Sequence, residues 1–279
     1  MTVRPILVAQ ITDLHIKKPG ALAYGRVDTA AALSRCVETL NRLSPRPDLV
    51  VISGDLADTP TPEEYDHLMA LLAPLDIPFA ATAGNHDDRA LLRNALPHQD
   101  YANAAGTLNI QRTVGDIDIL LIDSSVPQAS HGWIDTQTLA WLDAALAQSA
   151  TRPALLFLHH PPFLTGIDHM DVQNLGNADE LAALLRRHDR ARLIAAGHVH
   201  RAVMTAFAGI PATICPAPNH AVALDLDEQY PPSFNVEPPA FHLHAWFAGA
   251  GFGRLVTHFV PIGHFDGPHP FFAADGRLL

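Results

Sequence analysis

Apolar runs and amphipathic stretches alternate over the first two thirds of the chain. The runs at residues 6–11, 48–53 and 154–158 are short, contiguous and rich in valine, isoleucine and leucine, which predicts buried strands. A stretch with helical spacing begins after Asp28, whose carboxylate can cap the helix, and its apolar residues fall on one face. This alternation of strand and helix patterns favours an α/β fold.

Similar patterns continue through the rest of the chain. Thr61-Pro62-Glu63-Glu64 is a capping box with proline in the first turn, so a helix begins there. Further helices are predicted at 87–96, 135–148 and 178–188, and further strands at 78–82, 117–122 and 192–196. After about residue 201 short strands follow, at 202–208, 211–215, 240–247 and 254–260. We expect one layered α/β sandwich over residues 1–279, with 221–279 as a small β-rich cap or subunit-contact extension.

Five short polar fragments stand at the ends of predicted strands. They are Asp13-Leu14-His15, Gly54-Asp55, Gly84-Asn85-His86-Asp87, His159-His160-Pro161-Pro162 and Gly197-His198-Val199-His200. Because sites in α/β folds lie beyond the carboxyl ends of strands, we expect the fragments to gather in one place. Together they supply two carboxylates, one amide and four imidazoles, which two neighbouring divalent cations need when one carboxylate bridges them.

The spacing within two fragments also suits metal binding. Asp13 and His15 are two residues apart, so in extended backbone both side chains would point the same way and hold one cation. His198 and His200 have the same spacing after Gly197, which lets the backbone turn tightly.

The remaining polar residues of the fragments have distinct expected roles. The Asp55 carboxylate can bridge two ions, and Asn85 offers a neutral carbonyl ligand. His86 lies beside Asn85 and is the natural candidate to protonate a leaving oxygen or to hydrogen-bond a phosphate. We interpret Asp87 as a residue that supports the ligands or caps a helix, rather than as a ligand.

Net charge limits the classes of partner. The formal charge of −11 disfavours nucleic acids and anionic membranes, since both need a basic surface. A small anionic substrate remains compatible, because bound cations reverse the sign locally. The four positive charges of two cations exceed the three negative charges of Asp13, Asp55 and a bridging hydroxide. Such a site favours a phosphoryl group over a neutral amide.

Cysteine usage and the start of the chain are consistent with a cytoplasmic protein. Cys36 and Cys215 form neither a CxxC pair nor a disulfide framework, and we expect both to be small buried hydrophobic residues. The first residues lead into a strand without the features of a signal peptide, and no apolar run is long enough to span a bilayer.

In this order, the five fragments resemble the calcineurin-like metallophosphoesterase family, and within it most closely the bacterial class III cyclic nucleotide phosphodiesterases and the related glycerophosphodiesterase. The resemblance covers about residues 5–220 and includes Tyr24-Gly25-Arg26-Val27-Asp28, Asp123-Ser124-Ser125 and Gly132-Trp133. It implies the αββα sandwich of that family. It also implies a first metal held by Asp13, His15, Asp55 and His200 and a second held by Asp55, Asn85, His159 and His198. His220 takes the place of a second histidine that contacts substrate.

The resemblance further implies a phosphodiesterase in which a metal-bridging hydroxide attacks phosphorus. The substrate would be a 3′,5′-cyclic nucleotide or a glycerophosphodiester, and the sequence does not choose between them. A phosphomonoesterase or nucleotide hydrolase on the same fold is the alternative within enzymes, and a non-catalytic interaction scaffold is the alternative outside them. The nitrogen and oxygen ligands suit Mn²⁺, Fe²⁺, Zn²⁺ or Co²⁺. We expect a homo-oligomer, a dimer or larger.

Overall fold

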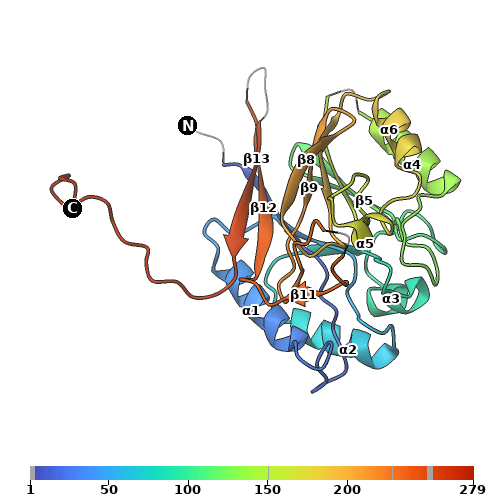
Figure 1. Cartoon of the computed structure of the whole chain (residues 1–279). Coiled ribbons are helices and arrows are strands. Elements are labelled where there is room, and N and C mark those ends of the chain that lie inside the picture. The colour runs from blue at the N-terminus through green and yellow to red at the C-terminus, as the bar shows by residue number, and fades with distance from the viewer. Residues whose placement is uncertain (1–3, 150, 228, 250–253) are drawn as a thin grey trace.

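Two sheets packed face to face form the centre of the molecule (Figure 1). The structure is a computed structural model that describes residues 4–149, 151–227, 229–249 and 254–279. In spatial order the first sheet contains β13 (Arg254–Pro261), β12 (Ala240–Phe247), β1 (Ile6–Ile11), β2 (Leu49–Ser53) and β3 (Phe79–Thr82). The second contains β4 (Ile110–Val114), β5 (Ile117–Ile122), β6 (Ala154–Leu158), β7 (Ala191–Ala196), β9 (Ile210–Ile214) and β8 (Val203–Phe207).

Helices cover the outer face of each sheet. The first sheet packs against α1 (Thr29–Arg42), α2 (Pro62–Leu72) and α3 (Arg89–Ala95), and the second against α4 (Thr136–Ala147) and α6 (Ala178–Leu185). A third cluster of buried apolar residues, including Val51, Ile119, Phe157 and Trp246, fills the space between the sheets. These layers confirm the predicted αββα sandwich. None of the helices in the described ranges is long and apolar enough to cross a membrane.

The predicted caps form, and they fix where two helices begin. The Asp28 carboxylate accepts a hydrogen bond from the amide of Ala31, at 2.9 Å. Thr61 caps α2 by accepting from the amide of Glu64, while the Glu64 carboxylate accepts from the amide of Thr59 at 2.7 Å. Both helices follow a strand of the first sheet, so the caps hold the strand-end loops in place.

The segments after residue 220 lie in different parts of the structure. β12 pairs antiparallel with β1, and β13 pairs with β12, so both belong to the first sheet. A separate two-stranded ribbon joins β10 (Ala221–Val222) and β11 (Phe234–Asn235). β4, β10, β11 and the short α5 (Asp168–Asp171) were not predicted by the sequence pattern. Beyond residue 262 the chain runs away from the sandwich as an extended tail (Figure 1).

The two cysteines have the expected burial, and two histidines of β12 are buried as well. Cys36 and Cys215 are both free thiols with no exposed surface, and burial raises the pKa of Cys36 to about 12. His242 and His244 alternate on β12 and are both buried. The His244 ring packs against the ring of Phe157 from the second sheet, with centroids 5.7 Å apart. These histidines are therefore part of the core between the sheets.

Burial of His242 makes stability depend on pH. Burial lowers its pKa to about 4, whereas an unfolded histidine titrates near 6.5. Between these values the unfolded chain binds the additional proton, so stability is present above about pH 6.5 and falls as the pH decreases towards 4. We expect His242→Gln to reduce the pH dependence of the free energy of unfolding by about 1 kcal/mol per pH unit between these two pKa values.

Urea unfolding of the wild type and the variant at several pH values measures this slope. His258→Gln is the matched control, because His258 lies exposed on β13, and it should keep the wild-type slope. Equal slopes for wild type and His242→Gln would show that burial of this imidazole does not control acid stability.

Candidate metal centre

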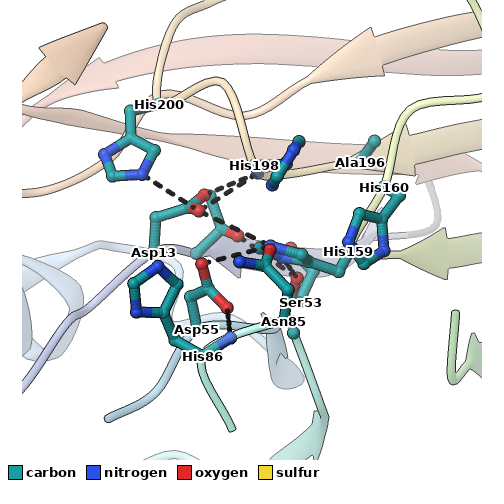
Figure 2. A network of polar contacts seen from close by, with 12 residues as sticks. Asp13, Ser53, Asp55, Asn85, His86, His159, His160, Ala196, His198 and His200 are labelled. Atoms are coloured by element: carbon teal, nitrogen blue, oxygen red, sulfur yellow. Dashed lines mark hydrogen bonds and ion pairs between the residues drawn. The ribbon is translucent and has the colours of Figure 1, made fainter. Parts of the chain in front are cut away.

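The predicted ligands lie together at the carboxyl ends of strands from both sheets. Asp13 follows β1, Asp55 follows β2, and Asn85 follows β3. From the second sheet, His159 follows β6, and the fragment containing His198 and His200 follows β7. Figure 2 shows these side chains converging from the two sheets. The site is therefore built at the junction between the layers, as the position of the fragments predicted.

Five of these residues adopt an unusual backbone conformation. The φ angles are 54° at Asp13, 46° at His15, 51° at Asp55, 72° at His198 and 57° at His200. This left-handed region costs energy for residues other than glycine, and such residues concentrate at functional sites. Asp13 and His15 therefore do not lie in extended backbone, the condition under which their spacing would point both side chains the same way. The chain turns at each ligand instead, and backbone hydrogen bonds between neighbouring strand-end loops hold the turns.

Three glycines let these loops approach one another closely. A Cβ atom added at Gly84 would lie 2.1 Å from Oδ1 of Asp55, and one at Gly54 would lie 2.4 Å from Nδ1 of His159. At Gly197 it would lie 2.1 Å from Oγ1 of Thr12. Gly197 is thus needed for close packing rather than for the tight turn that its position suggested, since its φ angle is not positive.

One group of ligands surrounds Asp13. Nε2 of His200 lies 3.3 Å from a carboxylate oxygen of Asp13 and 3.2 Å from Nε2 of His15. Nδ1 of His200 donates to the carbonyl of His220 at 3.3 Å, and Nδ1 of His15 lies 3.3 Å from the carboxylate of Asp58. In neutral imidazoles with these protons, both Nε2 atoms carry lone pairs, and these face each other.

A second group of ligands surrounds Asp55. Nδ1 of His159 donates to the carbonyl of Ser53 at 2.9 Å, which leaves a lone pair on Nε2 of the neutral ring. That nitrogen lies 3.1 Å from Oδ1 of Asn85 and 3.3 Å from Oδ2 of Asp55. Nε2 of His15 lies 3.5 Å from the same Asp55 oxygen. Asp55 therefore faces both groups, as a bridging carboxylate would.

His198 lies to one side of this arrangement. Its backbone amide donates to the carboxylate of Asp13 at 3.0 Å. Its ring packs beside the rings of His159 and His160, with ring centroids 5.1 and 4.8 Å away. The Nε2 atom of His198 is buried and has no hydrogen-bond partner among the described residues. A buried nitrogen of this kind is free to bind a cation.

Two residues that the sequence analysis did not assign as ligands also contact this site. Nδ1 of His160 lies 2.8 Å from the hydroxyl of Ser124, and the buried ring forms a three-histidine group with His159 and His198. Asp58 lies beside His15, and both Lys17 and His15 lower the pKa of its partly buried carboxyl. A carboxylate on the far nitrogen of a metal-binding histidine is a common supporting contact. Its only signal in the sequence is its position three residues after Asp55.

Burial and proximity shift the pKa values of the acids and imidazoles. Burial lowers the pKa of His198 to about 3, which keeps the ring neutral. Burial acts in the same direction on His159, but the Asp55 carboxylate outweighs it and raises that pKa to about 9. For Asp55, the effect of burial is outweighed by His159, His86 and His15, which hold its pKa well below the usual value. A proton on His159 thus offsets the negative charge of the Asp55 carboxylate, as a bound cation would.

These observations fit a divalent metal centre. Lone pairs of nitrogen and oxygen converge in two adjacent places, and the carboxylates of Asp13 and Asp55 are almost completely buried there. Buried carboxylates are costly unless paired with positive charge. Nitrogen and oxygen ligands without thiolate suit Mn²⁺, Fe²⁺, Zn²⁺ or Co²⁺.

Two further histidines, His86 and His220, border the centre. Nδ1 of His86 donates to the carbonyl of Asp58 at 2.8 Å, so Nε2 is the nitrogen left for a substrate. The rings of His15 and His86 are 4.6 Å apart. His220 packs against His200, with ring centroids 4.5 Å apart. Both predicted substrate residues, His86 and His220, line the same cavity beside the ligands.

Comparison with known proteins agrees with this geometry. The model of the family described as calcineurin-like phosphoesterase matches residues 6–202. The chain belongs to this family. It is 38% identical to a probable glycerophosphodiester phosphodiesterase of Arcobacter nitrofigilis, over 98% of this chain and 100% of that protein. It is 35% identical to a cAMP/cGMP dual specificity phosphodiesterase of Mycobacterium tuberculosis, over 76% of this chain and 67% of that protein.

The fold also matches that of a solved structure. A dimetal phosphatase from Danio rerio superimposes with a TM-score of 0.67 and 17% sequence identity, covering 94% of this chain and 98% of that one. At this identity the likeness concerns the fold alone. It supports the assignment of the two sheets and their covering helices to the calcineurin-like phosphoesterase architecture.

Within this site, the carboxylate of Asp87 links two ligand loops through hydrogen bonds, and Asp87 belongs to none of the groups of described residues that could hold a cation. Its carboxylate accepts from the amides of Leu56 at 3.1 Å, Ala57 at 3.2 Å and Gly84 at 2.9 Å, and from the hydroxyl of Tyr65 at 3.0 Å. Of the two roles considered for it, support of the ligands is the one seen. The cap of α3 is the next residue, Asp88.

We expect Asp87→Asn to weaken both the fold and the metal centre. The side chain of asparagine has a single acceptor oxygen, so some of the backbone N–H groups that now donate to Asp87 would lose their partner. Each buried N–H group left without a partner lowers the stability of the fold by about 1–3 kcal/mol. Looser loops at Asp55 and Asn85 should reduce metal affinity about 10- to 100-fold. Unfolding and calorimetric metal titration measure the two effects. Asp88→Asn is the control, because asparagine also caps helices. Wild-type metal affinity in Asp87→Asn would contradict this role.

Proposed function

We propose that this chain is a binuclear metal-dependent phosphodiesterase acting on small organic phosphodiesters. The observation that carries the proposal is the position of Asp55 between two converging sets of lone pairs. A single carboxylate shared by two cations leaves the site with excess positive charge, which binds the anionic phosphate of a diester. Similar proteins named as glycerophosphodiester and cyclic nucleotide phosphodiesterases support the same class.

The ligand sets in this proposal are those implied by family resemblance. Asp13, His15, Asp55 and His200 would hold the first ion, and Asp55, Asn85, His159 and His198 the second. When bound, the ions supply Lewis acidity, lower the pKa of water and neutralise charge on phosphorus oxygens. The cation could be Mn²⁺, Fe²⁺, Zn²⁺ or Co²⁺, since the ligand set does not distinguish among them.

The remaining residues position the substrate and move a proton. His86 has its Nδ1 proton engaged by the Asp58 carbonyl, so in the cationic form its Nε2 proton faces away from that contact. From there it can protonate the leaving alkoxide oxygen. His220 lies across the same cavity and can donate to a phosphate oxygen.

A hydrolysis panel tests the class of enzyme. We expect cleavage of a nitrophenyl diester, cyclic AMP or glycerophosphocholine, with much slower cleavage of the matching nitrophenyl monoester. A clear preference for the monoester would favour a phosphomonoesterase or nucleotide hydrolase. No hydrolysis of any ester with any of the four metals would favour an interaction scaffold.

The role of Asp55 is tested by metal titration. We expect Asp55→Ala to lower the affinity for both ions, because its carboxylate faces both groups of ligands. His15→Ala is the matched comparison and should weaken mainly one ion. Losses of about 10-fold or more are expected for removal of a ligand or its support. Calorimetry with Mn²⁺ measures both affinities. Two ions bound at wild-type affinity by Asp55→Ala would disprove the bridge.

The role of His86 is tested by the leaving group. If His86 protonates the leaving oxygen, His86→Ala should slow an alkyl diester by about 10²- to 10⁴-fold and a nitrophenyl diester far less. Nitrophenolate departs without a proton, whereas an alkoxide needs one. Metal content is measured in parallel and should not change. Equal losses on both substrates would mean that His86 binds phosphate or supports the ligands instead.

The remaining parts of the proposal concern the whole protein. The entire chain would act as one domain, since residues from Asp13 to His220 form the site and β12 pairs directly with β1. Two buried free thiols suit the reducing cytoplasm, where we expect the enzyme to act. We expect a homo-oligomer that binds neither nucleic acid nor membranes, consistent with the charge of −11.

A further inference from the structure

The side chain of Gln10 is a fully buried amide on β1. Side chains alternate between the two faces of a strand. Ala9 and Ile11 pack in the apolar cluster beneath the helices of the first sheet, whereas Val8 lies in the cluster between the two sheets. Gln10 therefore points towards the second sheet, and none of its surface is exposed.

The amide nitrogen of Gln10 joins the ends of two strands that belong to different sheets. Nε2 donates to the hydroxyl oxygen of Ser53 at 2.9 Å and to the backbone carbonyl of Ala196 at 3.0 Å. Ser53 is the last residue of β2 in the first sheet, and Ala196 is the last residue of β7 in the second. Both N–H groups of the amide are used, so one side chain connects the two sheets through hydrogen bonds.

Both of these strand ends lead directly to predicted ligands. The carbonyl of Ser53 accepts from Nδ1 of His159 at 2.9 Å, and Asp55 follows Ser53 by two residues. His198 follows Ala196 by two residues in the same way. Ser53 and Ala196 lie among these ligands in Figure 2. The amide that joins them therefore links backbone segments that carry ligands in both sheets.

The opposite end of the amide is held by the core. Oε1 of Gln10 accepts from Nε2 of His244 at 3.3 Å, and Nδ1 of His244 accepts from the hydroxyl of Thr257 on β13 at 2.9 Å. Burial holds the pKa of His244 well below its usual value, so the neutral ring has one donor and one acceptor nitrogen. The carbonyl of Ala196 can only accept, so it must face the N–H groups of Gln10. These contacts give the amide a single orientation.

Packing alone does not require an amide at this position. Apolar side chains such as Val51, Ile119 and Phe157 fill the rest of the space between the sheets. A buried amide destabilises the fold unless it is hydrogen-bonded, whereas a fully bonded polar network fixes one arrangement of the elements that it joins. The contacts of Gln10 therefore favour a role in the geometry of the strand ends.

The two proposed ions depend differently on the spacing between the sheets. The first ion would take three of its four ligands from the loops after β1 and β2. Backbone hydrogen bonds already join these loops, from the amide of Asp13 to the carbonyl of Gly54 at 3.0 Å and from the amide of His15 to the carbonyl of Asp55 at 3.0 Å. The second ion would take two ligands from each sheet, so its site changes more when the sheets move relative to each other.

We propose that Gln10 is a positioning residue of the metal centre, which fixes the separation of the two sheets where they hold the second ion. This inference rests on the proposed function, since it uses the ligand sets proposed there. Gln10 acts through Ser53 and Ala196. Without its N–H groups, the end of β7 would no longer be tied to the end of β2, and His198 would shift relative to His159.

Gln10→Met tests this role, because methionine is also long and unbranched but has no N–H group. The carbonyl of Ala196 keeps a partner in this variant, since it also accepts from the amide of Cys215 at 2.9 Å. We expect affinity for the second ion to fall about 10- to 100-fold and affinity for the first ion to fall less than about 3-fold. Calorimetric titration of the metal-free protein with Mn²⁺ measures both affinities. His15→Ala, which removes a proposed ligand of the first ion only, identifies the binding step of that ion.

Ser53→Ala is an independent second variant that removes one of the two contacts of the amide. We expect a smaller loss of affinity for the second ion than in Gln10→Met. Because the two side chains act through the same contact, Ser53→Ala should cause little further loss when it is added to Gln10→Met. Circular dichroism of each variant shows whether the fold is retained.

Asn177→Leu is the matched control, because Asn177 is another buried amide that bonds to the backbone. Its Nδ2 donates to the carbonyl of Ile134 at 2.8 Å, and its Oδ1 accepts from the amide of Ile134 at 3.0 Å. These contacts join the start of α6 to the segment before α4, and Asn177 belongs to none of the groups of described residues that could hold a cation. The control should lower stability towards urea but keep both metal affinities.

Three results would overturn the role of Gln10. They are wild-type affinity for both ions in Gln10→Met, equal losses for the two ions, and the same selective loss in Asn177→Leu. Failure of the proposed function is separate. In that case the wild type would bind two ions but hydrolyse no diester, including bis(nitrophenyl) phosphate, and the effect of Gln10→Met on the second ion would still be measured.

Discussion

Two buried carboxylates at the junction of two sheets constrain the rest of the site. Asp13 and Asp55 have almost no exposed surface and lie near several imidazoles. Negative charge in such a place is tolerated only when positive charge accompanies it. Protons on imidazoles such as His159 can supply it in part, and divalent cations can supply it fully. This requirement explains why the histidines must approach from both sheets.

Close approach explains the local structure around the ligands. The strand-end loops touch at glycines where no Cβ atom fits, and the turns hold Asp13, Asp55 and His200 in left-handed conformations. Backbone hydrogen bonds and the carboxylate of Asp87 join the loops that follow β1, β2 and β3. Their combined energy compensates for the strain at individual residues. The result is a closely packed set of ligands beside a cavity formed by less regular loops.

The sequence predicted what depends on local pattern and residue identity. Buried strands, the caps at Asp28 and Thr61, and the gathering of the polar fragments all follow from such signals. β4 was missed because Gln111, Arg112 and Thr113 give this edge strand no clear alternation. The contacts of His160 and Asp58 with the ligands depend on loops that meet only in the folded chain. The resemblance of motifs assigned the ligands, and the fold brings them together.

Titration of metal-free protein with Mn²⁺ tests the central claim most directly, with bound metal and hydrolysis of a phosphodiester followed in the same samples. The account predicts that the chelated protein is inactive and that activity rises as the second ion binds, reaching its maximum with two ions per chain. Full diester hydrolysis with one ion per chain, or in the presence of chelator, would contradict the binuclear phosphodiesterase.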